Sequence, residues 1–239
     1  MFTIAHSELT QILRDRSTLV TSFFMPLAAA AFFIYYRDVL ERFTSLGYLA
    51  AVLVLTIAAF SLYTTVVTTL AARRQNLFLK RLRSTAASDP AILTGLVLPV
   101  TVISMTQVGL ILVAFAVVSG APANIPLLAL AIVATFVMML ALGLATAGLT
   151  SSSERAQITT LPVSLGTIAV ATWVGITGTE SLTVVKRALP GGSATELVIQ
   201  AWNGGVLTSD SLMLLLPTLV WVVVAVALAA RLFRWEPRR

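Results

Sequence analysis

Five long stretches of the chain contain no charged side chain, and this feature limits the fold more than any other. They lie between Arg16 and Arg37, Arg42 and Arg73, Asp89 and Glu154, Arg155 and Glu180, and Asp210 and Arg231. A helix needs about 20 apolar residues to cross the hydrocarbon core of a membrane. Four of the stretches fit one crossing each. The stretch after Asp89 fits two, with a turn at 119–126, where Gly and Pro residues cluster.

The composition supports a membrane protein. Only 11% of the residues are charged, whereas ordinary globular chains carry about 25%. The chain has no cysteine, which excludes disulfide bonds and thiolate metal sites. We therefore predict an all-α polytopic membrane protein in which residues 1–239 form a single transmembrane domain. Its six transmembrane helices are expected near 17–36, 48–71, 91–118, 127–149, 157–178 and 211–231.

The basic residues of the predicted loops are divided unequally between the two sides of the membrane. Six spans place both termini on one side, and that side carries most of the Lys and Arg residues. Cytoplasmic loops usually hold this excess. We therefore expect a multi-pass protein of the cell membrane with both termini in the cytoplasm, and a charge pattern that favours lipid over nucleic acid. The cytoplasmic set comprises Arg14, Arg16, Arg73, Arg74, Lys80, Arg81, Arg83, Arg155, Arg231, Arg234, Arg238 and Arg239.

The first sixteen residues have the pattern of an amphipathic helix. Glu8 and Asp15 are unusual in the basic region of a signal peptide. An apolar face with helical spacing indicates instead a helix that lies on the inner leaflet. The alternative is that residues 1–16 simply extend the first span into water. The apolar face consists of Phe2, Ala5, Leu9, Ile12 and Leu13.

A basic stretch, RRQNLFLKRLRST at 73–85, follows the second predicted span. It combines five basic residues with large apolar residues, so we predict a helix over 73–86 that lies along the membrane and also presents a docking surface. A loop that only sets the membrane topology would need the basic residues alone. That simpler function is the alternative.

This stretch resembles the segment after the second span in ABC-transporter permeases of the drug- and polysaccharide-exporting class, which includes the daunorubicin-resistance-like proteins. That family often shows Ala-Arg-Arg-Glu, a small residue, and then Leu-Lys-Arg-Leu-Arg-Ala-Thr-Pro. The chain departs from the pattern at Gln75 for Glu, at Leu77 and Phe78 for Gly-Thr, and at Ala86 for Pro. The matching residues are Ala72, Arg73, Arg74, Leu79, Lys80, Arg81, Leu82, Arg83, Ser84 and Thr85.

The resemblance implies that the basic stretch is a coupling helix that docks on an ABC ATPase. It implies an exporter of two ATPase subunits, this permease and a second permease, identical or paralogous. The exported substrate would be a hydrophobic or amphiphilic drug, lipid or lipid-linked molecule, as in multidrug resistance. No phosphate-cradling G-x-x-x-x-G-K-[ST] occurs here, so we expect ATP and Mg to bind the partner ATPase. This chain is expected to be non-catalytic, without cofactor or metal. The coupling residues would be Arg73, Arg74, Leu77, Phe78, Lys80, Arg81, Leu82 and Arg83.

The predicted outer loop, 179–210, is the second informative region. A short helix is expected at 194–202, with Ser193 as N-cap and Glu196 completing a capping box, and with Gly204 and Gly205 ending it. In related permeases such a segment dips into the outer leaflet, returns, and forms an external gate. Its gate residues here would be Leu197, Ile199 and Trp202. A disordered extracellular loop is the alternative.

The predicted spans contain little polar chemistry. Thr64, Thr65, Thr68 and Gln107 are candidates to line the transport pathway, although threonine in membrane helices usually bonds its own backbone or a neighbouring helix. No charged residue lies at mid-depth, which disfavours a proton-driven carrier.

Two other classes of membrane protein compete with the exporter permease. A vitamin-binding membrane subunit of an ABC-type importer also has six spans, but it lacks a basic coupling helix after span 2. An intramembrane protease of the rhomboid type needs a histidine within a span, and His6 lies in the N-terminal segment. A metal-dependent lipid-transferring enzyme needs clustered aspartates, which this chain does not have.

Overall fold

The computed structural model describes residues 23–42, 44–84, 88–206, 208–233 and 235. Their regular structure is entirely helical, as predicted. The elements are α3 (Met25–Tyr35), α4 (Arg37–Leu40), α5 (Leu46–Thr56), η2 (Ile57–Tyr63), α6 (Thr64–Gln75), α7 (Phe78–Arg83), α8 (Asp89–Ser119), α9 (Ile125–Leu149), α10 (Ser153–Thr177), α11 (Thr183–Ala188), α12 (Gly192–Asn203), α13 (Ser209–Met213) and α14 (Leu215–Leu232).

Five helices in the described part of the chain are long and apolar enough to cross a membrane. A shorter apolar helix, Pro26–Tyr35, corresponds to the end of the predicted first span. The beginning of that span and the predicted surface helix 1–16 lie outside the described residues. The all-helical fold with several candidate membrane spans is therefore confirmed, and the count of six remains a prediction. The five helices are Leu46–Gln75, Asp89–Ser119, Ile125–Leu149, Ser153–Thr177 and Ser209–Leu232.

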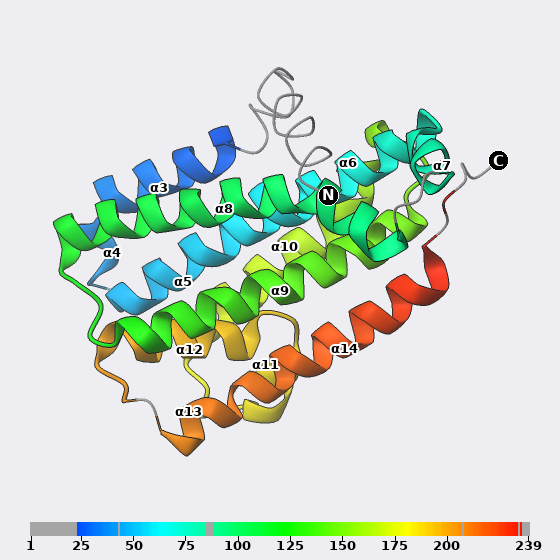
Figure 1. Ribbon diagram of the computed structural model, residues 1–239. Helices are drawn as coiled ribbons and strands as arrows, with labels where there is room; N and C mark the ends of the chain where they lie inside the picture. Colours follow the sequence, from blue (N-terminus) through cyan, green and yellow to red (C-terminus); the bar gives the residue numbers. More distant parts are fainter. Residues whose placement is uncertain (1–22, 43, 85–87, 207, 234, 236–239) are drawn as a thin grey trace.

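One continuous helix, Leu46–Gln75, forms the centre of the molecule. It consists of α5, η2 and α6, and nearly all its side chains between Gly47 and Ala71 are buried. Helices α8, α9, α10 and α12 pack around it, whereas α14 lies along α9 at the periphery (Figure 1). The second predicted span is thus the core of the bundle.

The middle of this central helix, Ile57–Tyr63, is a π-helix. The hydroxyl of Thr64 donates to the carbonyl oxygen of Ala59, five residues back, at 3.0 Å. On the same segment, the Ser61 hydroxyl bonds the Ser104 hydroxyl of α8 at 2.9 Å. Insertion of π-helical turns into an α-helix is rare and frequently marks functional sites.

Helix α12 begins partway along the bundle and runs outward to one of its ends. Gly191, which precedes it, lies beside Leu55 and Thr167. Leu55 is about ten positions from the start of the central helix, and Thr167 is about ten positions from the end of α10. At the rise of an α-helix, these positions correspond to a depth of about 15 Å. At its other terminus, the Asn203 side chain accepts a bond from the Gly47 N–H at 3.1 Å. The chain therefore runs into the bundle through α11 and back out through α12, which together are called the α11–α12 segment here.

The start of α12 differs from the predicted capping box. Gly191 has a positive φ of 92° and is the N-cap in place of Ser193. The Ser193 hydroxyl instead bonds the Thr218 hydroxyl of α14 at 3.0 Å, and Glu196 pairs with Arg187. The capping box was wrong because tertiary partners occupy both side chains. The predicted end at Gly204 is confirmed, with φ 108°.

We predict that Gly192→Ala disrupts the descent of this segment. An added Cβ would lie 1.7 Å from the carbonyl oxygen of Lys186, which is backbone and cannot move aside alone. The free energy of unfolding should fall by more than about 2 kcal/mol. Thermal unfolding of the purified protein in detergent measures this change.

Gly166→Ala is the matched control, because its added Cβ would meet nothing within 4 Å. Within helix α10, alanine should stabilise the protein by up to about 1 kcal/mol relative to glycine. Wild-type stability of Gly192→Ala would contradict the described geometry of the turn.

Candidate functional site

The basic stretch lies at one end of the bundle, here called the α7 end, and it is not one continuous helix. Helix α6 runs to Gln75, and a separate six-residue helix, α7, starts at Phe78. Arg73 and Arg74 therefore belong to the end of the central helix, and the expected helix over 73–86 is divided. Residues 85–87 lie outside the described part.

Backbone geometry at Leu77 produces the break. Leu77 has a φ of 58°, in the left-handed region, where a residue other than glycine costs about 1–2 kcal/mol. Its N–H donates to the Arg74 carbonyl at 3.1 Å, and its own carbonyl accepts the Arg81 N–H at 3.1 Å. The pattern that the stretch resembles has glycine at this position, and glycine adopts this conformation readily.

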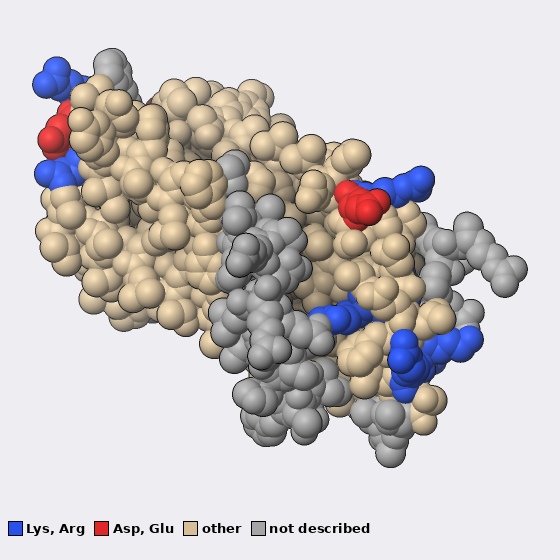
Figure 2. Space-filling view, turned by 90° about the horizontal axis from the view of Figure 1, so that it is seen from above, with Lys and Arg blue, Asp and Glu red and all other residues tan. Residues whose placement is uncertain are grey.

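Helix α7 has one apolar side in contact with the bundle and one basic side exposed. Leu79 is fully buried, and Phe78 and Leu82 pack against the hydrophobic core. Lys80, Arg81 and Arg83 are exposed, and Leu77 is 46% exposed. Figure 2 shows that charged side chains gather at the two ends of the viewed face, with uncharged surface between them. We call Leu77, Lys80, Arg81 and Arg83 the α7 tip.

Arginine side chains hold the α7 end together. Arg74 is 1% exposed and donates to the carbonyl oxygen of Thr150, at the end of α9. The Arg73 guanidinium lies over the Phe78 ring, 5.5 Å from its centroid. The Arg74 bond connects the central helix to α9, and the Arg73 contact connects it to α7.

Arg83 makes the corresponding connection at the far end of α7. Its guanidinium lies 5.2 Å from the centroid of the Trp235 ring and 3.3 Å from Oδ1 of Asp89. Sequence reasoning identified the basic residues but not these anchors. Thr150 is distant from the stretch in the sequence, and Asp89 belongs to no motif. No sequence signal therefore identified these two partners.

The candidate gate residues lie at the opposite end, on α12. Leu197 is fully buried, Trp202 is 5% exposed, and Ile199 is partly buried against the core. The Trp202 ring packs on Phe115 of α8, with centroids 5.2 Å apart. These three side chains therefore form part of the core of a single chain, between α12 and its neighbours.

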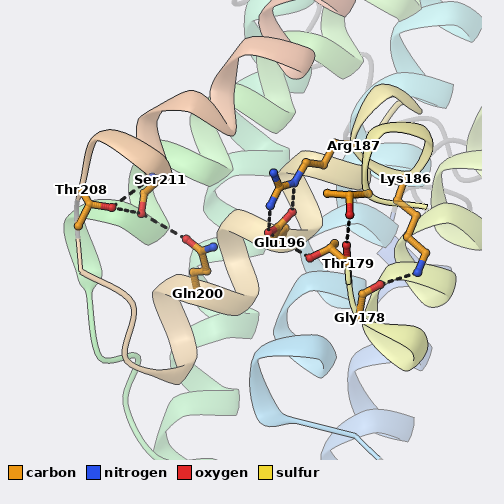
Figure 3. Close-up of polar contacts among 9 residues, drawn as sticks. Gly178, Thr179, Lys186, Arg187, Glu196, Gln200, Thr208 and Ser211 are labelled. Atoms are coloured by element: carbon orange, nitrogen blue, oxygen red, sulfur yellow. Dashed lines mark hydrogen bonds and ion pairs between the residues drawn. The ribbon is translucent and has the colours of Figure 1, made fainter. Parts of the chain in front are cut away.

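Two basic residues of α11 hold the α11–α12 segment in place (Figure 3). Arg187 makes two bonds to the Glu196 carboxylate, of 2.8 and 2.6 Å, and the hydrogen bond to Glu196 raises the pKa of Arg187. Lys186 is fully buried and donates to the Thr177 hydroxyl at 2.8 Å and to the Gly178 carbonyl at 2.6 Å. Arg187 thus links α11 to α12, and Lys186 links α11 to the end of α10.

The candidate pathway residues make local contacts in this structure. The Thr64 hydroxyl donates to Ala59, and the Thr68 hydroxyl donates to the carbonyl of Thr64 at 2.8 Å. Thr65 and Gln107 are 5% and 6% exposed. Bonding of the hydroxyls to their own helix agrees with the usual behaviour of threonine in membranes. In the described ranges, no three His, Asp or Glu side chains come together as metal ligands would.

Comparison with known proteins shows that most of the chain matches one protein family. The family described as "ABC-2 family transporter protein" matches residues 38–230. The match spans the central helix, α7 and the α11–α12 segment. Comparisons with curated proteins and with solved structures give no match.

We predict that Arg74→Ala lowers stability, because it removes a buried, charged donor between α6 and α9. Loss of such a bond should cost about 2 kcal/mol. Arg81→Ala removes the same type of side chain from an exposed position and should change the stability by less than about 0.5 kcal/mol. Thermal unfolding in detergent compares the two variants, and equal stabilities would show that the Arg74 contact contributes nothing.

Proposed function

Because the chain belongs to the ABC-2 family of transporter proteins and is therefore a permease of an ABC transporter, we propose that it works in an ATP-driven exporter. A separate ATPase chain binds ATP and Mg and hydrolyses the nucleotide. Two such ATPases act with this permease and a second permease, which is identical or paralogous. The family membership favours transport over the intramembrane enzyme, and the basic α7 tip favours an exporter over a vitamin-binding importer subunit.

The observation that carries this proposal is the geometry of the α7 tip. Its basic side is exposed, while its apolar side is anchored in the bundle. A soluble partner can therefore contact Lys80 and Arg81 without displacing Leu79. The exposed Leu77 adds an apolar contact at the apex of the turn. The combination is what a docking element between a membrane domain and an ATPase requires.

Movement of α7 would reach the spans through defined contacts. Arg73 links α7 to α6 through the Phe78 ring, and Arg74 links α6 to α9 through Thr150. A displacement at the tip would thus shift the central helix and α9 together. The π-helical turn Ile57–Tyr63 is the point at which the central helix would yield, because its hydrogen bonding already departs from the α-helical pattern.

In this proposal the α7 end faces the cytoplasm, together with both termini. The unequal distribution of Lys and Arg supports that orientation. The re-entrant α11–α12 segment then lies in the outer leaflet, and Leu197, Ile199 and Trp202 close the outer end of the pathway. The apolar spans suit a hydrophobic or amphiphilic substrate, as in the daunorubicin-resistance-like exporters that the sequence resembles.

We predict that removing the charges of Lys80 and Arg81 weakens the coupling to the ATPase. The double variant Lys80→Ala/Arg81→Ala should assemble less tightly with its ATPase, by about tenfold, because each exposed charged contact contributes up to about 1 kcal/mol. Binding to the purified ATPase, together with transport-linked ATP hydrolysis, measures the effect.

The control for this variant is Arg37→Ala/Arg42→Ala, which removes two charges from the opposite end of the bundle. It should bind the ATPase like the unmodified protein. Both proteins must keep the thermal stability of the original chain. Unchanged assembly and hydrolysis in the α7 variant would leave the basic stretch as a topological anchor.

Substitutions of Trp202 test the proposed outer gate. Trp202→Ala should raise ATP hydrolysis in the absence of substrate, because it opens a cavity beside Phe115. Trp202→Phe keeps an aromatic contact and should behave like the original. ATPase assembly should be intact in both, since the site lies at the other end from α7. Loss of assembly in Trp202→Ala, or unaltered hydrolysis, would remove support for a gate.

A further inference from the structure

A cavity of about 520 Å³ lies between the α11–α12 segment and the beginning of α14, at the end of the bundle opposite α7. Neither the coupling site nor the candidate gate residues line it. Its wall combines three polar side chains with four apolar ones. The lining residues are Arg187, Gln200, Asp210, Met213, Leu214, Leu216 and Pro217.

The polar side of the cavity is held in place by contacts among α11, α12 and α13. Glu196 binds Arg187 through two guanidinium nitrogens, which orients the side chain and leaves further N–H donors on its fork. The Gln200 side chain accepts a bond from the Ser211 hydroxyl at 3.2 Å (Figure 3). Arg187 and Gln200 are therefore held in place before any ligand arrives.

Asp210 differs from the other two polar residues. Its side chain is exposed, and within the described ranges no side chain pairs with its carboxylate. Glu196 neutralises the charge of Arg187, so the cavity as a whole has a surplus of one negative charge. A ligand with a cationic group next to an anionic group would match both Asp210 and the remaining donors of Arg187.

The apolar side of the cavity continues along α14. Leu216, Val220 and Val223 have helical spacing on one face of the helix, and they are 59%, 58% and 68% exposed. A polar cavity at the end of such a face suits an amphiphile whose apolar chain runs parallel to a transmembrane helix.

We propose that this cavity binds a phospholipid with a primary-amine headgroup. The ammonium group donates to the Asp210 carboxylate, the phosphate accepts from the Arg187 guanidinium, and an acyl chain lies along Leu216, Val220 and Val223. A choline headgroup fits less well because its quaternary nitrogen donates no hydrogen bond. A glycerol headgroup leaves Asp210 beside a net negative charge. The inference concerns binding alone and does not rest on the proposed direction of transport.

The test is a lipid titration of the purified full-length chain in detergent, followed by native mass spectrometry. Phosphatidylethanolamine, phosphatidylcholine and phosphatidylglycerol with the same acyl chains are the probes. Phosphatidylethanolamine should bind about three- to tenfold more tightly than the other two, as expected for a charge-assisted hydrogen bond at a partly exposed site. Equal binding of the three lipids would overturn the proposal.

Three variants show whether Asp210 determines the preference for phosphatidylethanolamine. Asp210→Asn should abolish the preference for phosphatidylethanolamine, and Asp210→Glu should retain it. Asp38→Asn is the matched control, because Asp38 is an exposed carboxylate that already pairs with Arg37 at 3.1 Å, and it should change nothing. Persistence of the preference in Asp210→Asn would refute the assignment.

A final probe tests the phosphate contact. A long-chain primary amine without phosphate should bind at least about threefold more weakly than phosphatidylethanolamine, since it lacks the acceptor for Arg187. Equally tight binding of the simple amine would remove the function assigned to Arg187. The elution volume and thermal stability of each variant establish that the cavity is folded, and Asp210→Glu provides a folded reference at the same position.

Discussion

The central helix Leu46–Gln75 is enclosed by protein along nearly its whole length, and the arrangement of the other helices depends on it. In a membrane, backbone polar groups must be satisfied within the segment, so a helix is the stable form of such a run. Side chains then decide the packing. Small residues allow close approach: Gly143 of α9 lies against Val66 and Tyr63 of the central helix.

Different chemistry holds the two ends of this central helix. At one end Arg74 reaches a carbonyl at the terminus of α9, and at the other the Gly47 N–H donates to the side chain of Asn203 at the end of α12. Each contact joins a helix terminus, where backbone groups lack intrahelical partners, to a distant part of the chain. The end with α7 is thereby linked to the spans, and the end with α12 is closed by a segment that is itself buried.

Basic side chains serve two purposes in this arrangement. Arg74 and Lys186 are buried and bond backbone carbonyls or hydroxyls, so they connect elements. Lys80 and Arg81 are exposed on α7. A count of positive charges cannot separate these uses, although the count is sufficient to favour one orientation in the membrane. The distinction matters for function, since substitutions in the buried set would alter stability before they altered coupling.

The sequence alone determined the all-helical membrane fold, because charge-free stretches of about 20 residues have few other stable forms. It also indicated the family, through residues 72–85, and the end of α12 at Gly204, since local backbone preference decides such a terminus. Only the tertiary structure decided the break at Leu77, the N-cap at Gly191 and the partners of Ser193, Glu196 and Arg74. The partners of Ser193, Glu196 and Arg74 are Thr218, Arg187 and Thr150, which lie on other elements and outside the local pattern around each residue. Local spacing predicts which residues share a helix face, whereas the choice among competing polar partners is made when distant segments pack together.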